Sequence, residues 1–291
     1  MLLQYLAKKK GGRLQHVATF LNACKSTGDA EWIMNNTIQS YDEAAEEEFS
    51  YVGLTSILET QCIVKLMKRK GRMAAQEVAV MKWFSAHPHI NIIQGICYFT
   101  CKDSPIRWKS RITQPQAFCN GTSSSTSFLV IIQEYIIAGD LSNVSEWTAS
   151  LWKSVVLQLT YACMEWWAQG FVFGDWHFGN ILLDTTQSNS HSYTAFGKTF
   201  KVRTHGVSPV LTDFARSTLQ PPGSLDLWML ADQIATIWDK FESSCPFKTN
   251  DEDDRFADFA LQIGIVQNTT DFIAIVSRFR RALRRPESKH V

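Results

Sequence analysis

The stretch GFVFGDWHFGNILLD, residues 170–184, decides the fold that this sequence predicts. Apolar residues stand on both sides of a short polar loop, which carries a carboxylate at Asp175 and a carboxamide at Asn180. Two apolar elements would hold these groups rigidly, as metal-assisted phosphoryl transfer requires: one group orients or deprotonates the nucleophile and the other ligates Mg²⁺. An ordinary loop with an Asx-capped turn fits the same stretch equally well, so the rest of the chain has to decide.

The composition predicts a globular protein with a large core. The chain has 291 residues, 45% of them hydrophobic, which suits one two-lobed domain or two small ones. A net charge of +1 gives no field that would attract nucleic acid. No apolar run approaches a membrane span, and the apolar patch at the start precedes its charges, the reverse of a secretory signal. Seven cysteines without a C-x-x-C pair predict free thiols in a reducing compartment, cytosolic or nuclear. We expect a monomer without a membrane or nucleic-acid partner.

The first half of the chain predicts strands around one helix. EFSYVGLTSI (48–57) and TQCIVKLMK (60–68) are rich in β-branched and aromatic residues and flank a turn at Leu58–Glu59. A helix with Glu77 in its first half follows, and it ends at Pro88. FLVIIQEYI then predicts a buried strand.

Two further segments frame this half. Residues 1–30 predict a helical extension, and residues 102–127, which are polar and rich in Ser, Thr and Pro, predict a mobile insertion. At AGDL, Asp140 is placed to cap the next helix. The predicted boundary therefore separates residues 31–138 from residues 139–291.

The second half predicts helices. The apolar spacing over 144–170 is helical. After the opening stretch we expect a hairpin-like region with a polar connection at about 185–198, then a short strand that ends at Asp213. A helix follows in SLDLWMLADQIATIWDKF. An acidic turn, NDEDDR, precedes two short helices that end in the basic RFRRALRR, residues 278–285, which we interpret as a solvated helix face.

In this order the motifs resemble the eukaryotic protein kinase family in a divergent form. The strand Cys62–Lys65 is similar to the V-A-I-K strand, and Glu77 stands where a helix glutamate pairs with that lysine. A lysine at this position can also be a plain edge or snorkelling residue. FLVIIQEYIIAGDL resembles the hinge, with Gln133 in the gatekeeper position.

The second half continues the resemblance. Asp175 and Asn180 keep the D-x-x-x-x-N spacing of the catalytic loop, Asp213-Phe214 matches D-F-G, and Asp226 matches the buried aspartate of the large lobe. The resemblance covers roughly residues 50 to 240. It implies an α+β, bilobal kinase-like fold: a small β-rich N-lobe with one main helix, a larger helical C-lobe and a shortened activation segment.

The resemblance also implies roles and cofactors, ATP and Mg²⁺. Lys65, held by Glu77, would contact the α- and β-phosphates, and Asn180 and Asp213 would ligate Mg²⁺. Asp175 would accept or orient the proton of the substrate hydroxyl. His177 would either donate to the γ-phosphate or serve only for packing and capping. The remaining candidate nucleotide-binding residues lie at the hinge and just after it: Glu134, Tyr135, Ile136 and Asp140.

Three departures from the family pattern matter. No G-x-G-x-x-G precedes Lys65, and the acidic run YDEAAEEE stands near the place of that loop. Gly174 replaces the arginine of H-R-D, only twelve residues separate Asp213 from Asp226, and no A-P-E occurs, so no activation-loop phosphate is expected. Ala215 replaces the D-F-G glycine, which is tolerated where φ is negative.

These features look most like the divergent kinases of large DNA viruses, which would place the protein in a host cell, although Haspin-like and small-molecule kinases share some of them. The leading hypothesis is an active serine/threonine protein kinase that acts on protein substrates. The alternatives are a pseudokinase that serves as a binding scaffold, suggested by the missing glycine loop, and a small-molecule kinase, suggested by the missing peptide platform.

Overall fold

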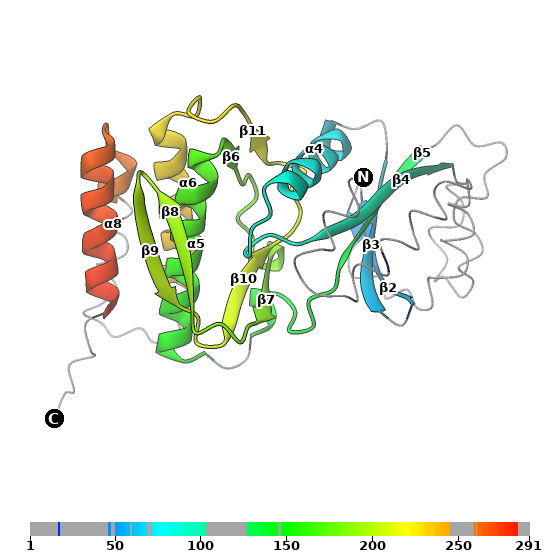
Figure 1. The fold of residues 1–291 in the computed structure, drawn as a ribbon, viewed down its shortest axis with the longest axis horizontal. Helices are drawn as coiled ribbons and strands as arrows, with labels where there is room; N and C mark the ends of the chain where they lie inside the picture. The colour runs from blue at the N-terminus through cyan, green and yellow to red at the C-terminus, as the bar shows by residue number, and fades with distance from the viewer. Residues whose placement is uncertain are drawn as a thin grey trace. The chain divides into compact units, whose positions relative to one another are not determined.

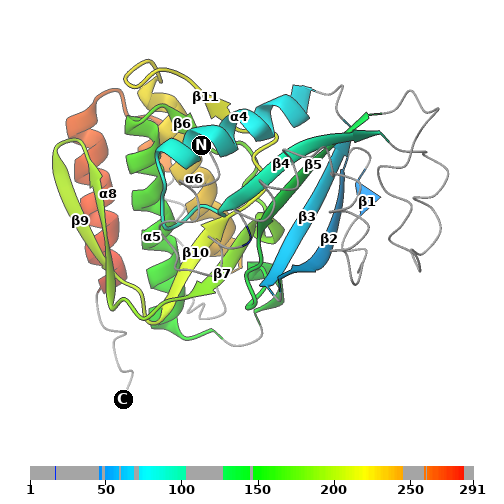
Figure 2. The same ribbon diagram turned by 45° about the vertical axis from the view of Figure 1, so that its right-hand side comes forward.

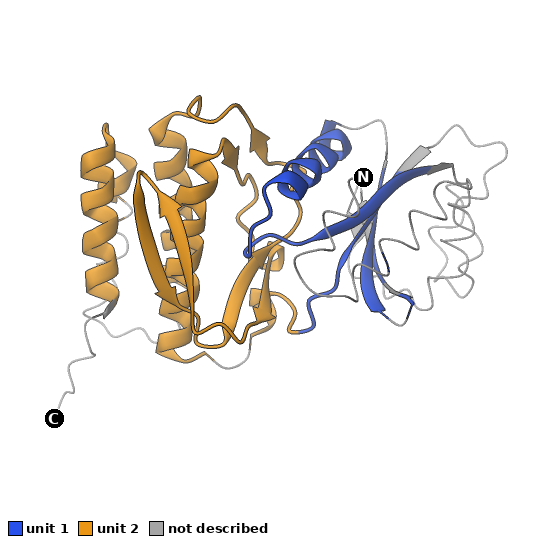
Figure 3. Cartoon of the chain, in the orientation of Figure 1, with its two compact units in different colours: residues 1–137 blue, residues 138–291 orange. Residues whose placement is uncertain are grey.

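The computed structural model describes residues 17, 46–47, 50–58, 60–68, 72–102, 127–144, 147–244, 259 and 261–284. The chain divides into two compact units, residues 1–137 and 138–291 (Figure 3). The division falls one residue before the predicted 138/139 boundary. The predicted extension at 1–30, except Val17, the acidic turn at 250–255 and most of the insertion at 102–127 lie outside the described residues.

Unit 1 is built on an antiparallel five-stranded sheet in the order β1-β2-β3-β5-β4 (Figures 1 and 2). Its strands are β1 Glu46–Glu47, β2 Ser50–Ile57, β3 Thr60–Lys68, β4 Gly95–Lys102 and β5 Ser127–Glu134. The predicted strands at 48–57, 60–68 and 128–136 are confirmed to within a few residues. Leu58, with φ of 49°, lies in the turn that joins β2 to β3.

A single described helix, α4 Arg72–Ala86, follows β3 in unit 1, as predicted. Its buried positions recur at helical spacing, at Ala74, Glu77, Val80, Met81 and Phe84. Glu77 therefore lies on the same face as the apolar residues, and that face carries its carboxylate into the protein. This placement explains how a charged residue can be completely buried in an otherwise apolar row.

Unit 2 is centred on the buried helix α5 Ala149–Ala168, which Thr148 caps through its side chain. Antiparallel pairs of short strands flank α5: β6 Phe171–Val172 with β11 Thr218–Leu219, β7 Ile181–Thr185 with β10 Val207–Leu211, and β8 Ser190–Ala195 with β9 Lys198–Arg203. The described part of the unit also contains the helices α6 Leu227–Ser243 and α8 Thr269–Arg284 and two 3₁₀ turns, η3 Leu141–Asn143 and η4 Phe178–Asn180.

The polar connection predicted at about 185–198 is wrong in part, because it contains strand β8. Burial alternates along β8 and β9, where Tyr193, Phe200 and Val202 face inward. The two turn residues, Phe196 and Gly197, have φ of 53° and 68°. Positive φ at both central positions is the geometry of a type I′ hairpin, which usually carries Asn-Gly or Asp-Gly. Because Phe-Gly stands here in place of these pairs, the sequence did not indicate the turn.

The apolar core of unit 2 is rich in aromatic residues. Trp238 stacks on Phe279 with ring centroids 3.8 Å apart, and Tyr161 stacks on Phe200 at 4.5 Å. These contacts tie α6 to α8 and α5 to β9. Within the described residues, no helix is long and apolar enough to cross a membrane.

Candidate functional site

In unit 1 the predicted ion pair between Lys65 and Glu77 is present. Lys65 Nζ lies 3.5 Å from Glu77 Oε1, and the two side chains are only 5% and 0% exposed. Strand β3 supplies the lysine from the middle of the sheet, between Val52 of β2 and Ile131 of β5. A central strand with a buried lysine excludes the edge and snorkelling interpretations of this residue.

The hinge segment follows directly from β5. Glu134 is buried and serves the fold: its amide donates to the Gln94 carbonyl, and its Oε1 accepts from the Gln94 amide at 2.7 Å. For nucleotide binding it therefore offers its backbone carbonyl at most. The amides of Tyr135 and Ile136 donate to no carbonyl elsewhere in the described part of the chain.

Gln133, in the gatekeeper position, adds an unmet donor beside this segment. It is 2% exposed, and its Nε2 has no hydrogen-bond partner among the described residues. Leaving a buried donor unpaired costs about 1–3 kcal/mol, so an unsatisfied amide in a native protein calls for an explanation such as a ligand. Gln133 Nε2 and the amides of Tyr135 and Ile136 are therefore donors that no described residue satisfies.

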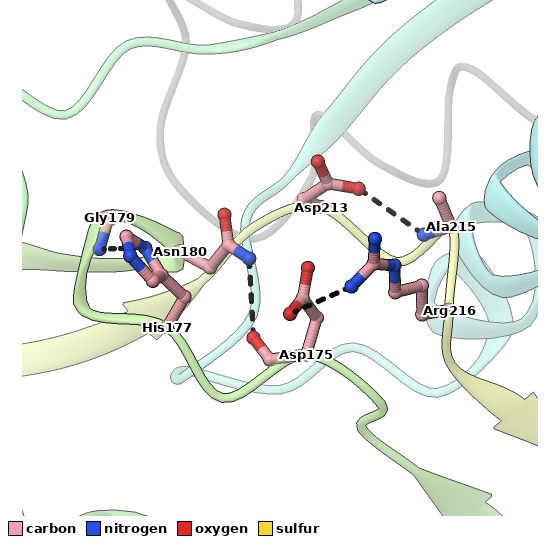
Figure 4. Close-up of polar contacts among 7 residues, drawn as sticks. All are labelled: Asp175, His177, Gly179, Asn180, Asp213, Ala215 and Arg216. Carbon is pink, nitrogen blue, oxygen red and sulfur yellow. Dashed lines mark hydrogen bonds and ion pairs between the residues drawn. The ribbon is translucent and has the colours of Figure 1, made fainter. Parts of the chain in front are cut away.

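In unit 2 the stretch that opened the sequence forms the predicted loop between two strands. β6 ends at Val172 and β7 begins at Ile181, so Asp175 and Asn180 lie between anchored apolar segments. Asn180 Nδ2 donates to the Asp175 carbonyl at 3.2 Å (Figure 4), and the Asn180 backbone carbonyl accepts from the Thr212 amide at 3.0 Å. These bonds fix the amide group and leave Oδ1 as the atom that can ligate a metal.

Asp213 has a left-handed backbone, with φ of 60°. Aspartate visits this region more readily than most residues, yet non-glycine residues pay about 1–3 kcal/mol there, and such strain concentrates at functional sites. Its Oδ1 accepts from the Ala215 amide at 3.3 Å (Figure 4). Positive φ falls on Asp213 and not on Ala215, which meets the condition under which alanine replaces the glycine.

A carboxylate and a carboxamide oxygen are ligands that suit Mg²⁺, which commonly takes one or two carboxylates and completes its shell with water and phosphate oxygens. Asp213 and Asn180 therefore fit this ion. Within the described residues no three His, Cys, Asp or Glu side chains cluster as a metal site. Any metal held here would depend on the substrate for further ligands.

Arg216 is a residue of this site that the sequence analysis missed. Its Nη1 lies 3.7 Å from Asp175 Oδ1, with the two side chains 65% and 33% exposed (Figure 4). The segment Phe214–Gln220 runs back along 170–174, where β11 pairs with β6, and this return brings Arg216 to Asp175. No local signal predicts the contact, because it depends on the return of the chain after Asp213.

His177 takes the capping role that the sequence left open. Its Nδ1 accepts from the Gly179 amide at 3.1 Å, which caps η4 (Figure 4). Asp140 caps η3 as predicted, accepting from the Ser142 amide at 2.9 Å and from the Asn143 side chain at 3.1 Å. Its use in capping leaves less of this carboxylate for a nucleotide.

The prediction that Asp226 is a buried aspartate is wrong. Asp226 is exposed at the N-cap of α6 and makes no side-chain capping bond. Gln233, seven residues or about two turns further along α6 and buried, instead donates from Nε2 to the Phe173 carbonyl. Phe173 lies two residues before Asp175, so a neutral amide anchors the loop. The match of Asp226 to the kinase aspartate therefore did not reveal that Gln233 has the anchoring role.

The structure also gives a different reason for glycine at position 174 from the one predicted. A Cβ atom at this position would lie 1.9 Å from the Arg216 carbonyl oxygen. The glycine is thus required by the close approach of the returning chain, whether or not an arginine is missing for phosphate sensing. Of the acidic run YDEAAEEE, only Glu46–Glu47, which form β1, belong to the described residues.

No family model and no curated protein matches the chain. A solved structure titled "WaaP in complex with acyl carrier protein" is similar at 12% identity and a TM-score of 0.48, over 88% of this chain and 93% of that one. A likeness this low says nothing about substrate or partner. What the chain itself provides is a mixed α/β protein with kinase-like motifs on the elements where the resemblance predicts them.

Proposed function

We propose that this protein is an ATP-dependent kinase that transfers a phosphoryl group to a serine or threonine hydroxyl of a protein substrate. The observation that carries the proposal is the buried Lys65–Glu77 pair. Taking two charges out of water costs several kcal/mol per ion, and apolar residues of similar size would pack there without that cost. A lysine kept charged and oriented inside the sheet is what binding of a triphosphate requires.

In this proposal each residue has one task. Lys65, oriented by Glu77, binds the α- and β-phosphates, and the backbone of Glu134, Tyr135 and Ile136 binds the adenine. Asp213 and Asn180 would hold Mg²⁺, which would supply the positive charge that the transferred phosphoryl group requires. Asp140 would bind the ribose only if its capping bonds to η3 rearranged.

On the acceptor side, Asp175 accepts or orients the proton of the substrate hydroxyl. Arg216 holds its carboxylate through the exposed ion pair. His177 binds the γ-phosphate only through Nε2, because Nδ1 already accepts from Gly179. The protein would act in the cytosol or nucleus, of a host cell if it is viral.

The short segment after Asp213 favours a second candidate, a small-molecule kinase. Residues 214–225 are fully described and folded back: Ser217 donates to Phe214, β11 pairs with β6, and Ser224 donates to Pro221. No extended stretch of this segment is left as a platform for a peptide. The missing glycine loop favours the third candidate, a pseudokinase scaffold.

Thermal unfolding with and without Mg-ATP tests the enzyme proposals against the scaffold. A site at a hundredfold excess over its Kd should stabilise the protein by about 2.7 kcal/mol. Asp213→Ala should lose this gain, whereas Asp232→Ala, a matched change at an exposed position of α6, should keep it. Absence of any gain in the wild type overturns both kinase proposals.

Labelled phosphate then separates the two kinases. Incorporation into generic protein substrates, abolished in Asp175→Ala, supports the protein kinase. ATP turnover stimulated by small hydroxylated compounds, without protein labelling, supports the small-molecule kinase instead.

A further inference from the structure

A cavity of about 1000 Å³ opens in unit 2 among the start of α5, the β8–β9 hairpin and the end of α8. None of the residues that line it belongs to the loop with Asp175 and Asn180 or to the segment with Asp213 and Arg216. The cavity is therefore distinct from the candidate catalytic residues of this unit, and nothing in the proposed phosphoryl transfer uses it.

The charge of the lining is one-sided. Among the described residues, the lining carries four cationic side chains, one imidazole and no acidic side chain; the cations are Lys153, Lys201, Arg203 and Arg280, and the imidazole is that of His205. None of the four cations has a carboxylate within ion-pair distance in the described part of the chain. In a chain whose formal net charge is only +1, this is a strong local concentration of positive charge.

Arg280 is held in place by the protein. Its Nη2 donates to the Lys201 carbonyl at 2.8 Å, and its guanidinium lies 5.7 Å from the centre of the buried Tyr161 ring. Nε is buried and has no hydrogen-bond partner within the described residues, so the fixed guanidinium keeps an unpaired donor besides Nη2. Such a preorganised fork loses less entropy on binding a phosphate than a free arginine does. On the predicted solvated face of RFRRALRR, Arg278 and Arg281 are exposed, whereas Arg280 is only partly exposed.

The backbone around the cavity is equally well anchored. Ser154 Oγ donates to the Arg203 carbonyl at 2.6 Å, which ties β9 to α5 as Arg280 ties it to α8. Ala149 and Ser150, in the first turn of α5, line the cavity as well. The Thr148 side chain caps only the Leu151 amide, so the amides of this turn add the positive end of a helix to the four cations.

The apolar part of the lining comes from Leu157, Val202 and Leu283. A cavity with cations on one side and carbon on the other suits a small molecule that carries several phosphates on a carbon ring or chain. Several cations are needed only for several negative charges, since one phosphate can pair fully with one arginine and one lysine.

We propose that this cavity is a second binding site of the protein, and that it takes a multiply phosphorylated small molecule or the equivalent headgroup of a lipid. Trp152, next to Lys153, packs on Phe241 at 6.1 Å, and Phe241 packs on Phe178 of η4 at 5.2 Å. These ring contacts connect the lining of the cavity to the loop that holds Asp175 and Asn180, so a ligand in the cavity can influence that loop.

Calorimetric titration of the full chain with inositol hexakisphosphate tests the site. We expect saturable one-to-one binding that Lys153→Gln with Lys201→Gln weakens by about tenfold or more, because hydrogen bonds to charged groups are the strong ones. Lys198→Gln, an exposed lysine of β9 that does not line the cavity, should change the affinity by less than about twofold. Asp213→Ala should bind like the wild type, which separates this site from the nucleotide site.

Absence of saturable binding overturns the proposal, as does an equal loss in Lys198→Gln or a loss in Asp213→Ala. Cosedimentation with phosphatidylcholine vesicles that contain phosphatidylinositol bisphosphate identifies the source of the phosphates. Tighter binding to these vesicles than to the free headgroup assigns the site to a lipid, and the reverse assigns it to a soluble compound. In both cases the double variant must lose the binding.

Discussion

Lys65 and Glu77 form a buried ion pair, 3.5 Å from nitrogen to oxygen, between the central strand β3 and the inner face of α4. Two motifs twelve residues apart in the sequence thus become one constellation. The pair fixes both the charge of the lysine and the position of the helix against the sheet, so its energetics can be tested apart from catalysis.

Glu77→Gln should destabilise unit 1 strongly. Removing one partner leaves the other charge buried and uncompensated, which costs about 3–5 kcal/mol. Chemical denaturation of the two single variants, Glu77→Gln and Lys65→Met, should show losses of this size. The double variant should recover most of the stability, because it removes both charges at once. A loss in the double variant equal to the sum of the two single losses would contradict the pairing.

Gly174→Ala should destabilise unit 2 and lower any phosphoryl-transfer activity. The new Cβ would lie 1.9 Å from the Arg216 carbonyl oxygen, so the returning segment must move away from Asp175. We expect a loss of about 3 kcal/mol or more, as for severe overpacking. Gly206→Ala is the matched control: its φ of 83° strains an alanine, but the added atom meets no neighbour within 4 Å. Its cost should stay near about 1–2 kcal/mol.

Most of unit 1 could be predicted from the sequence, because its signals are local. Runs rich in β-branched and aromatic residues predicted β2 and β3, an apolar run predicted β5 as a buried strand, and Pro88 predicted the end of α4. The spacing of the kinase motifs then placed Lys65 and Glu77 on elements that do meet. The register of the sheet and the complete burial of Glu77 needed the structure, because they follow from the pairing of segments distant in the sequence.

Unit 2 was harder to predict from the sequence, because its polar contacts join distant segments and use residue types that the kinase pattern does not have at these positions. The aspartate match at 226 was misleading, since the anchor of the loop is the amide of Gln233. Arg216 reaches Asp175 only because residues 214–220 fold back on 170–174. A hairpin-like region was expected here, but a polar connection was predicted in place of strand β8, because the turn that follows it is Phe-Gly.

Cys62 should be inert as a nucleophile at neutral pH. Burial, and then the nearby charge of Glu134, raise the pKa of its thiol from 9.0 to about 12. The pKa of Cys163 is also raised well above its ordinary value by complete burial. Alkylation by iodoacetamide at pH 8, read by mass spectrometry, should therefore spare both residues in the folded protein and modify both in urea. Modification of Cys62 at the same rate in both conditions would contradict its burial.

The raised pKa of Cys62 also predicts a loss of stability in alkali. The Cys62 thiol holds its proton more tightly in the folded state than in the unfolded chain. Its contribution to the free energy of unfolding is therefore complete below about pH 9 and is lost as the pH rises toward about 12. Cys62→Ala should show a flatter pH dependence of the free energy of unfolding than the wild type between these values.

Gln233→Leu should detach the loop that carries Asp175. The substitution keeps the volume but leaves the Phe173 carbonyl without its buried donor, at a cost of about 1–3 kcal/mol. Phosphoryl transfer should fall further than stability, with the loss in kcat rather than in KM for ATP, because the nucleotide groups of unit 1 are untouched.

Asp226→Ala tests the rival anchor that the kinase pattern predicts. Asp226 is exposed and makes no capping bond, so its loss should change stability by no more than about 0.5 kcal/mol and leave kcat intact. The opposite ranking of the two variants would return the anchoring role to the aspartate.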